Sequence, residues 1–198
     1  TDAAHAQGRI GCTTWANSLT AFDDLIVRVG DATGAPPGPL LEERFEGAFS
    51  VPWVFVDDGT VEGPSAWSLS RGELLQASNI ADGDGSRAGL PKRGTLAIAG
   101  DLAWRDYELR ASVLDQDDDA VGLVFRYRDS QNFYRFSLDA QRGYRRLVRC
   151  QGGAFALLAE DTYGHTPNRA QRIAIRAEGA RLRVLVDGEL FCEVLDPS

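Results

Sequence analysis

Apolar and polar residues alternate along most of the second half of the chain. From residue 107 onward the alternation has a period of two, which is the side-chain period of a β-strand. The segment 121–128 places apolar side chains on one face, with Arg126 and Arg128 on the other. This segment therefore predicts a strand with one buried face.

Turn-forming residues divide the chain into short segments of similar length. The dipeptide Asp187-Gly188 separates two apolar segments and suits a two-residue type I′ hairpin. Further upstream we expect strands near residues 41 to 45, 53 to 57, 66 to 69, 73 to 77 and 94 to 99. No segment has a helical stripe, and about 14 short strands are too many for one flat sheet. The pattern predicts an all-β fold made of two packed antiparallel sheets, a β-sandwich.

Length and charge limit the partners of this fold. The chain has 198 residues, of which 43% are apolar, and this suits one all-β domain. There are 29 acidic and 21 basic residues, so the formal net charge of −8 would repel a nucleic-acid backbone. No apolar stretch approaches the roughly 20 residues of a membrane helix. We expect neither nucleic-acid binding nor membrane insertion.

A Gly- and Pro-rich segment, residues 30–39, interrupts the strand pattern near the N-terminus. Such a composition is typical of a linker and does not suit the interior of a sheet. It divides the chain into a terminal strand pair, residues 1–29, and a main β-sandwich, residues 40–198.

Several runs of residues resemble one family of domains. They are 63–67 (GPSAW), 75–80 (LQASNI), 104–109 (WRDYEL), 117–129 (DDDAVGLVFRYRD) and 132–136 (NFYRF). These runs are similar to the laminin G-like, concanavalin A-like sandwich domains of lectins and glucanases, which occur as repeats in large secreted bacterial proteins. A more distant resemblance is to the C-terminal domain of thrombospondins. The resemblance implies a jelly-roll sandwich in an extracellular or cell-surface protein.

In that family a pattern GRIGxxxWAN, followed by FDDxxV, closes the domain. Here the two patterns occupy residues 8–17 and 22–27, at the start of the chain. The resemblance therefore implies a circularly permuted domain, or one unit of a tandem array or head-to-tail polymer. The strand pair would close its own sandwich or that of a neighbouring copy. The apolar residues available for such self-association are Ile10, Trp15, Phe22, Leu25 and Val27.

The acidic run at residues 115–119 is the strongest candidate for a metal site, because Ca²⁺ prefers hard oxygen ligands. It is not an EF-hand, since Ala120 stands at the sixth position and Arg126 at the twelfth. The resemblance implies instead a calcium site at the sandwich edge. Its candidate ligands are Asp117, Asp118 and Asp119, with Asp82, Asp84 and Asp129 as helpers. The alternative is a solvated acidic loop that prevents edge-to-edge aggregation.

Arginines recur across three successive predicted strands between residues 126 and 149. With neighbouring tyrosines they form a candidate site for a sugar acid or an acidic polymer, and the first candidates are Arg126, Tyr134 and Arg135. The alternative is cross-strand pairing of these arginines with the chain's own carboxylates.

The three cysteines, Cys12, Cys150 and Cys192, lack the paired spacing of a zinc site. If the chain ends are joined in space, Cys12 and Cys192 would lie on neighbouring strands and could form a disulfide. Three free thiols are the alternative.

Signals for catalysis are weak throughout the sequence. Glu160 and Asp161 are adjacent in a strand and point to opposite faces, so they do not form the carboxylate pair of a glycosidase. The sequence therefore predicts a non-enzymatic extracellular module with a structural or adhesive role, as the repeat unit of a tandem array or filament, with calcium as a stabilising ion. The alternative is a lectin-like domain that binds an extracellular polysaccharide.

Overall fold

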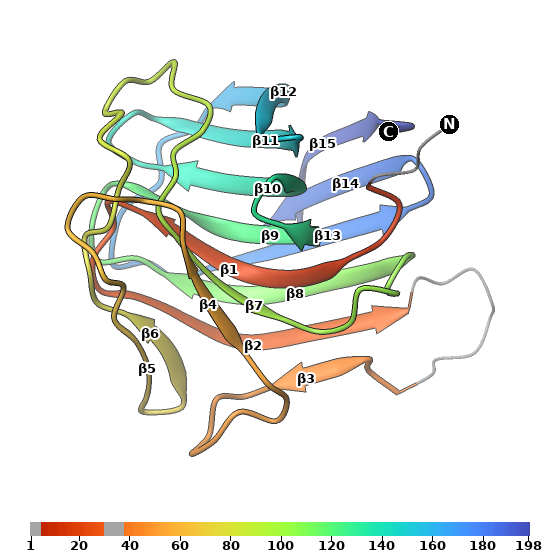
Figure 1. The fold of residues 1–198 in the computed structure, drawn as a ribbon, viewed down its shortest axis with the longest axis horizontal. Helices are drawn as coiled ribbons and strands as arrows, with labels where there is room; N and C mark the ends of the chain where they lie inside the picture. Colours follow the sequence, from red (N-terminus) through yellow and green to blue (C-terminus); the bar gives the residue numbers. More distant parts are fainter. Residues whose placement is uncertain (1–4, 30–37) are drawn as a thin grey trace.

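A computed structural model describes residues 5–29 and 38–198, which form fifteen strands in two packed antiparallel sheets (Figure 1). The predicted all-β sandwich is confirmed. Most of the predicted linker, residues 30–37, lies outside the described residues. Among the described residues, no helix has the length and apolarity required to cross a membrane.

Each sheet is built from strands that are distant in sequence. Sheet A consists, in spatial order, of β12 (Ala154–Thr162), β11 (Tyr144–Gln151), β10 (Asn132–Asp139), β9 (Ala120–Asp129), β1 (Arg9–Trp15), β7 (Thr95–Ala99) and β4 (Val54–Asp57). Sheet B consists of β15 (Glu189–Leu195), β14 (Arg181–Val186), β13 (Gln171–Glu178), β8 (Tyr107–Leu114), β2 (Thr20–Val29), β6 (Glu73–Gln76) and β5 (Trp67–Ser70). The short strand β3 (Leu41–Glu43) pairs with the second half of β2.

The first two strands lie in the middle of different sheets. β1 pairs with β9 on one side and β7 on the other, whereas β2 pairs with β8 on one side and with β6 and β3 on the other. The two strands of the predicted terminal pair therefore do not pair with each other. Both strands are fully paired within this chain, so they present no free edge to a second copy.

The five side chains suggested for self-association are all buried in the core of their own chain. None of these side chains is more than 4% exposed. The five residues are Ile10, Trp15, Phe22, Leu25 and Val27. Self-association through them stays a prediction, and it would require the two strands to leave the pairing described above.

The two ends of the described chain meet at Tyr134. The ring centroid of His5 lies 5.2 Å from that of Tyr134, and the hydroxyl of Ser198 lies 3.4 Å from the Tyr134 hydroxyl. In Figure 1 the first described residues before β1 lie correspondingly close to the C-terminus. Circular permutation requires such a juxtaposition and stays a prediction.

The connection between β6 and β7 covers the outer side of sheet A. Arg135 on β10 and Arg146 on β11 donate hydrogen bonds to carbonyl groups of residues 87–92 in this connection. β9 is buried on both faces over most of its length. Arg126 is only 1% exposed, and its guanidinium donates a hydrogen bond to the carbonyl of Arg105 in the connection between β7 and β8. The predicted half-buried strand at 121–128 is wrong in this respect, because the period of a strand does not reveal a loop that covers its outer face.

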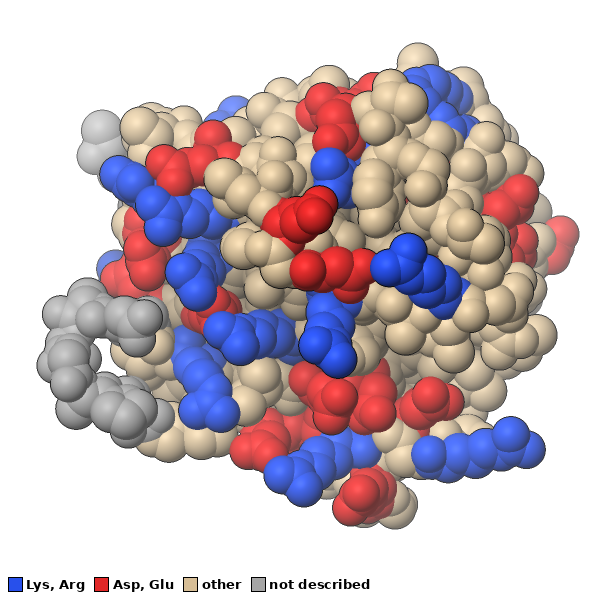
Figure 2. Space-filling view, turned by 180° about the vertical axis from the view of Figure 1, so that it is seen from behind, with Lys and Arg blue, Asp and Glu red and all other residues tan. Residues whose placement is uncertain are grey.

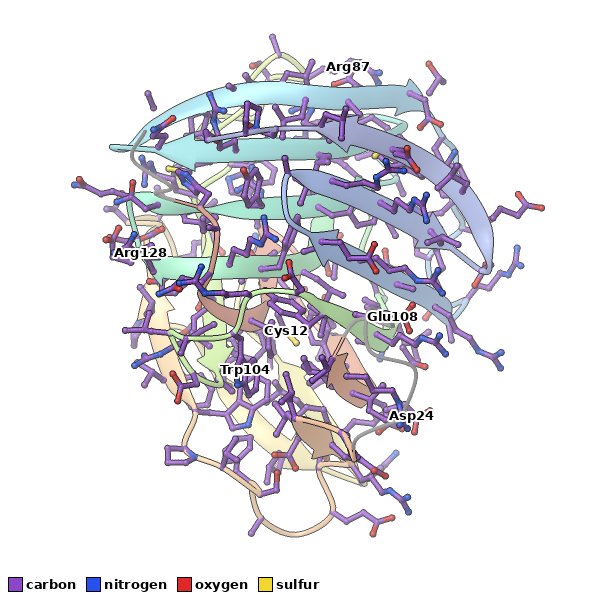
Figure 3. All side chains as sticks on the ribbon, turned by 90° about the vertical axis from the view of Figure 1, so that its right-hand side faces the viewer. Cys12, Asp24, Arg87, Trp104, Glu108 and Arg128 are labelled. Atoms are coloured by element: carbon purple, nitrogen blue, oxygen red, sulfur yellow. The ribbon has the colours of Figure 1, made fainter. Side chains whose placement is uncertain are left out.

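All three cysteines are free thiols in the structure. Cys12 lies on β1, between the two sheets (Figure 3), whereas Cys192 lies on β15 at the far edge of sheet B. The predicted neighbouring placement of Cys12 and Cys192 is therefore wrong, because β1 pairs with β7 and β9 in one sheet and β15 pairs with β14 in the other.

Stability is expected to fall as the pH rises above about 9. Burial raises the pKa of Tyr127 and of Tyr134 to about 12, and that of Cys192 to about 11. The unfolded chain loses these protons earlier, so each group lowers the free energy of unfolding by about 1.4 kcal/mol per pH unit within its window. Lys92 has the opposite effect on the free energy of unfolding. Burial and the charge of Arg142 lower its pKa to about 8, so the folded chain loses this proton before the unfolded chain does. Urea unfolding at about pH 8 and pH 11 measures the difference, and a midpoint that does not fall at the higher pH would contradict the prediction.

Candidate functional site

The outer face of sheet B carries a trough that runs across its strands. The floor is a row of residues paired in register on β2, β8, β13 and β14: Ile26, Arg110, Ala174 and Leu185. The residues flanking each of them along the strand are buried on the inner side, so these four side chains face outward. The small side chain of Ala174 lowers the floor between its larger neighbours. The trough has a volume of about 550 Å³.

One wall of the trough is held in place by Glu108 on β8. Its carboxylate accepts a hydrogen bond from Nε of Arg176 on the neighbouring strand and forms an ion pair with Nε of Arg110. Burial would raise the pKa of Glu108, but the hydrogen bonds and charges of these two arginines outweigh it and hold the pKa below its ordinary value. Glu108 therefore stays ionised and fixes two guanidinium groups along the trough.

The opposite wall consists of Ser112 on β8, Arg172 on β13 and Asp187 in the hairpin turn. The Asp187 carboxylate accepts a hydrogen bond from the Arg172 backbone N–H at 2.9 Å. It also lies 3.7 Å from a guanidinium nitrogen of Arg169. Hydroxyl, guanidinium and carboxylate groups thus line this side of the trough.

A β-bulge shapes the end of the trough on β2. The pairing of β2 with β8 shifts register between Asp23 and Ile26, and β2 changes its other partner from β6 to β3 at the same place. Asp24, within the bulge, has a φ of 49°, a left-handed conformation that Asp tolerates better than most residues. Bulges re-aim side chains, and Asp24 lines both the trough and a second hollow beside it.

The second hollow has a volume of about 480 Å³ and is strongly acidic. Its charged lining consists of Asp23, Asp24, Glu42, Glu43 and Glu46 against Arg44 and Arg71. Glu43 is buried and accepts hydrogen bonds from the backbone and hydroxyl of Ser50. The trough and the acidic hollow, which share Asp24 and Ile26, form one continuous polar surface.

Figure 2 looks at the molecule from behind, toward sheet B, and shows basic and acidic side chains interleaved over this face. Figure 3 places Asp24 and Glu108 on the outer side of the same sheet. Sequence analysis missed the trough. The sequence does contain a trace of the trough, because polar and charged residues occupy alternate positions of β8 and β13. It does not show, however, that these two strands and β2 are neighbours in one sheet.

The acidic run is brought together by the structure, at the end of the sandwich where β8 leads into β9. Asp117, Asp118 and Asp119 each offer a carboxylate oxygen within 4.8 Å of the other two. Each also has a partner already: Asp117 accepts hydrogen bonds from Ser18, and Asp119 forms an ion pair with Arg142. Asp118 accepts a hydrogen bond from the side chain of Gln141.

Calcium binding by Asp117, Asp118 and Asp119 stays a prediction. If these residues bind calcium, adding Ca²⁺ to chelator-treated protein is expected to raise its melting temperature, because a ligand that binds only the native state stabilises that state. An unchanged melting temperature would leave the run as a solvated loop.

The three helper residues are not part of this cluster. Asp82 accepts hydrogen bonds from the indole of Trp15 at 2.7 Å and from the Arg93 backbone at 2.9 Å. Asp84 caps the backbone of Ser86. Asp129 ends β9, whereas Asp119 precedes its first residue, so a strand length of roughly 30 Å separates them.

The predicted ligand-binding residues are all buried. Arg126 is 1% exposed, Tyr134 is completely buried and Arg135 is 4% exposed. The Arg126 backbone donates to the hydroxyl of Tyr107, and the ring of Tyr134 stacks on Phe125. Ligand binding by these three residues stays a prediction, and each of them already has a structural role.

Cross-strand pairing with carboxylates, the alternative interpretation of the arginines, is observed between β11 and β12. Arg145 and Arg146 on β11 lie directly opposite Asp161 and Glu160 on β12 and pair with them. Cross-strand pairing therefore uses two of these arginines and both carboxylates of the adjacent Glu160-Asp161 dipeptide.

No protein-family model matches the chain. A curated relative, an extracellular exo-α-L-arabinofuranosidase of Streptomyces chartreusis, is 29% identical over 185 residues. The match covers 92% of this chain and 19% of the relative, so the chain spans about a fifth of the relative's length. Among solved structures, the carbohydrate-binding module CBM66 from Bacillus subtilis is similar with a TM-score of 0.39 and 19% identity, covering 46% of this chain and 71% of that one.

Proposed function

We propose that this chain is a non-catalytic carbohydrate-binding module of a secreted protein that acts on polysaccharides, and that the glycan binds in the trough of sheet B. The observation that carries the proposal is the trough itself, an open polar channel across the strands of a rigid sheet. The relative supports it, because nearly the whole of this chain corresponds to a minor part of an extracellular arabinofuranosidase. A module of this size within a longer enzyme is suited to holding the enzyme on its substrate.

The chemistry of the trough suits hydroxyl-rich ligands. Arg110, Arg172 and Arg176 supply hydrogen-bond donors, while Asp24 and Asp187 supply acceptors. The apolar floor at Ile26 and Leu185 offers a surface for the C–H faces of sugar rings. Ligand sites combine an apolar surface with a small number of fixed polar groups in this way.

The geometry around Glu108 argues against this residue as the general acid of a glycoside hydrolysis in the trough. Glycoside hydrolysis requires a carboxylic acid whose pKa is raised so that it can donate a proton. Glu108 has a lowered pKa and is engaged by two arginines. A carboxylate held in this state orients donors and does not act as a general acid.

The proposal is tested by affinity electrophoresis of the full chain in gels that contain arabinan, arabinoxylan, galactan, glucan or polygalacturonate. We expect retardation by at least one neutral polysaccharide and no release of reducing sugar from any of them. A chain that passes all gels at the speed of a non-binding reference protein, or that releases sugar, would contradict the proposal.

The structural or adhesive role predicted from the sequence is less well supported than carbohydrate binding. It depended on the strand pair, which is fully paired within the chain. Sedimentation velocity at rising protein concentration separates the two functions, because a repeat unit that assembles by itself would form polymers without any glycan.

A further inference from the structure

We infer that the trough holds an extended segment of a neutral polysaccharide, lying across the strands, and that it discriminates against polymers that carry carboxylates. The inference rests on the proposed carbohydrate-binding function and specifies its ligand. It is carried by the length of the floor, the charge balance of the walls and the acidic hollow at one end.

The length of the floor indicates an extended ligand. The row of Ile26, Arg110, Ala174 and Leu185 continues to Leu190 on β15, which is paired with Leu185 and is 58% exposed. The four floor residues lie on neighbouring strands about 4.8 Å apart and span roughly 14 Å, and Leu190 extends this row beyond the lining of the trough. A channel of this length accommodates several sugar units in succession, rather than a single terminal sugar.

The charges of the lining balance. Three carboxylates (Asp24, Glu108 and Asp187) stand against three guanidinium groups (Arg110, Arg172 and Arg176). Two of these arginines already pair with Glu108. A polymer with a carboxylate on every unit would need an excess of cations to replace the hydration of its charges, and the trough provides none.

The acidic hollow adds repulsion at the β2 end. It is continuous with the trough through Asp24 and Ile26, and its lining has five acidic residues against two arginines. A carboxylate bound near Asp24 would lie within a Debye length of several like charges, since this length is about 10 Å at 0.1 M salt. The field of the hollow therefore lowers the affinity for an acidic polymer, whereas a neutral one is unaffected.

The test compares two derivatives of a neutral polysaccharide that retards the full chain. Hydroxyethyl and carboxymethyl derivatives with the same degree of substitution add groups of similar size and differ in charge. We expect the hydroxyethyl derivative to retard the chain at least roughly ten-fold more strongly at low salt, a difference of about 1.4 kcal/mol. The difference is expected to shrink as salt is raised, because the repulsion is screened.

A charge variant locates the discrimination. In Glu42→Gln with Glu46→Lys, the glutamine removes a negative charge and the lysine adds a cation, at two exposed positions of the acidic hollow that lie outside the trough. This variant is expected to gain affinity for the carboxymethyl derivative while its affinity for the parent polymer stays within about two-fold. The matched control, Asp101→Asn with Glu178→Lys, makes the same charge change at exposed positions outside the trough and the hollow, and is expected to leave the discrimination unchanged.

The outcomes separate the two proposals. Equal or tighter binding of the carboxymethyl derivative by the unaltered chain would overturn the inference and leave carbohydrate binding intact. Failure to bind any parent polysaccharide would overturn the proposed function and the inference together.

Discussion

Removal of residues 1–29 is expected to leave a chain that does not fold. β1 lies between β9 and β7, and β2 lies between β8 and the pair β6 and β3, so both sheets would be split. The deletion also removes the completely buried side chains of Ile10, Phe22 and Leu25. Truncating one such side chain costs about 2 to 5 kcal/mol, and a domain has about 5 to 15 kcal/mol of stability in total.

The measurement is thermal unfolding of the truncated chain, followed by circular dichroism and by the dispersion of its NMR spectrum. A cooperative transition at the temperature of the full chain would contradict the account of both sheets. The point variant Phe22→Ala serves as a graded control, with an expected loss of about 3 to 5 kcal/mol. Leu19→Ala, at a position that is 45% exposed and next to β2, is expected to have little effect.

Replacement of Arg135 by methionine is expected to destabilise the fold by about 3 kcal/mol without altering glycan binding. The Arg135 guanidinium donates hydrogen bonds to the carbonyl oxygens of Leu90, Pro91 and Lys92 at 2.6 to 2.9 Å. Burial lowers its pKa to about 10, so it is charged at neutral pH. Methionine fills much of the same space but leaves these three carbonyls without this donor and loosens the loop from sheet A.

For a domain of about this size, 3 kcal/mol corresponds to a fall of roughly 6 to 12 °C in melting temperature. Arg28→Met removes an arginine at an exposed position of β2 and is the matched control, with an expected change below about 0.5 kcal/mol. If Arg135→Met kept its melting temperature and lost glycan retention, Arg135 would be a ligand-binding residue, as its sequence context first suggested, and not the anchor of the loop.

The fold class was predictable because the period of a strand is local information. The alternation in β8 and β13 and the Asp187-Gly188 turn each depend on a few neighbouring residues. Strand order is not local. Arg110 and Ile26 are adjacent in sheet B although 83 intervening positions separate them in the chain, and no turn connects their strands.

Burial of charged residues was the second feature that the sequence could not show. Arg126 and Arg135 became ligand candidates because arginines recur, beside tyrosines, across successive predicted strands. The connection between β6 and β7 covers Arg135, which bonds to its backbone carbonyls, whereas Arg126 bonds to the carbonyl of Arg105 in the connection between β7 and β8. The trough lies on the other sheet, where no such connection intervenes among its lining residues.

The most direct test of carbohydrate binding in the trough is calorimetric titration of the chain carrying Ala174→Trp with an oligosaccharide of the retained neutral polysaccharide. Ala174 faces outward at the centre of the floor, so the indole fills the channel without entering the core. Leu157→Trp introduces the same ring on β12, at a position that is 47% exposed and outside the trough. We predict that Ala174→Trp abolishes the binding heat at an unchanged melting temperature while Leu157→Trp binds as the unaltered chain does; full binding by Ala174→Trp would show that the glycan does not occupy the trough.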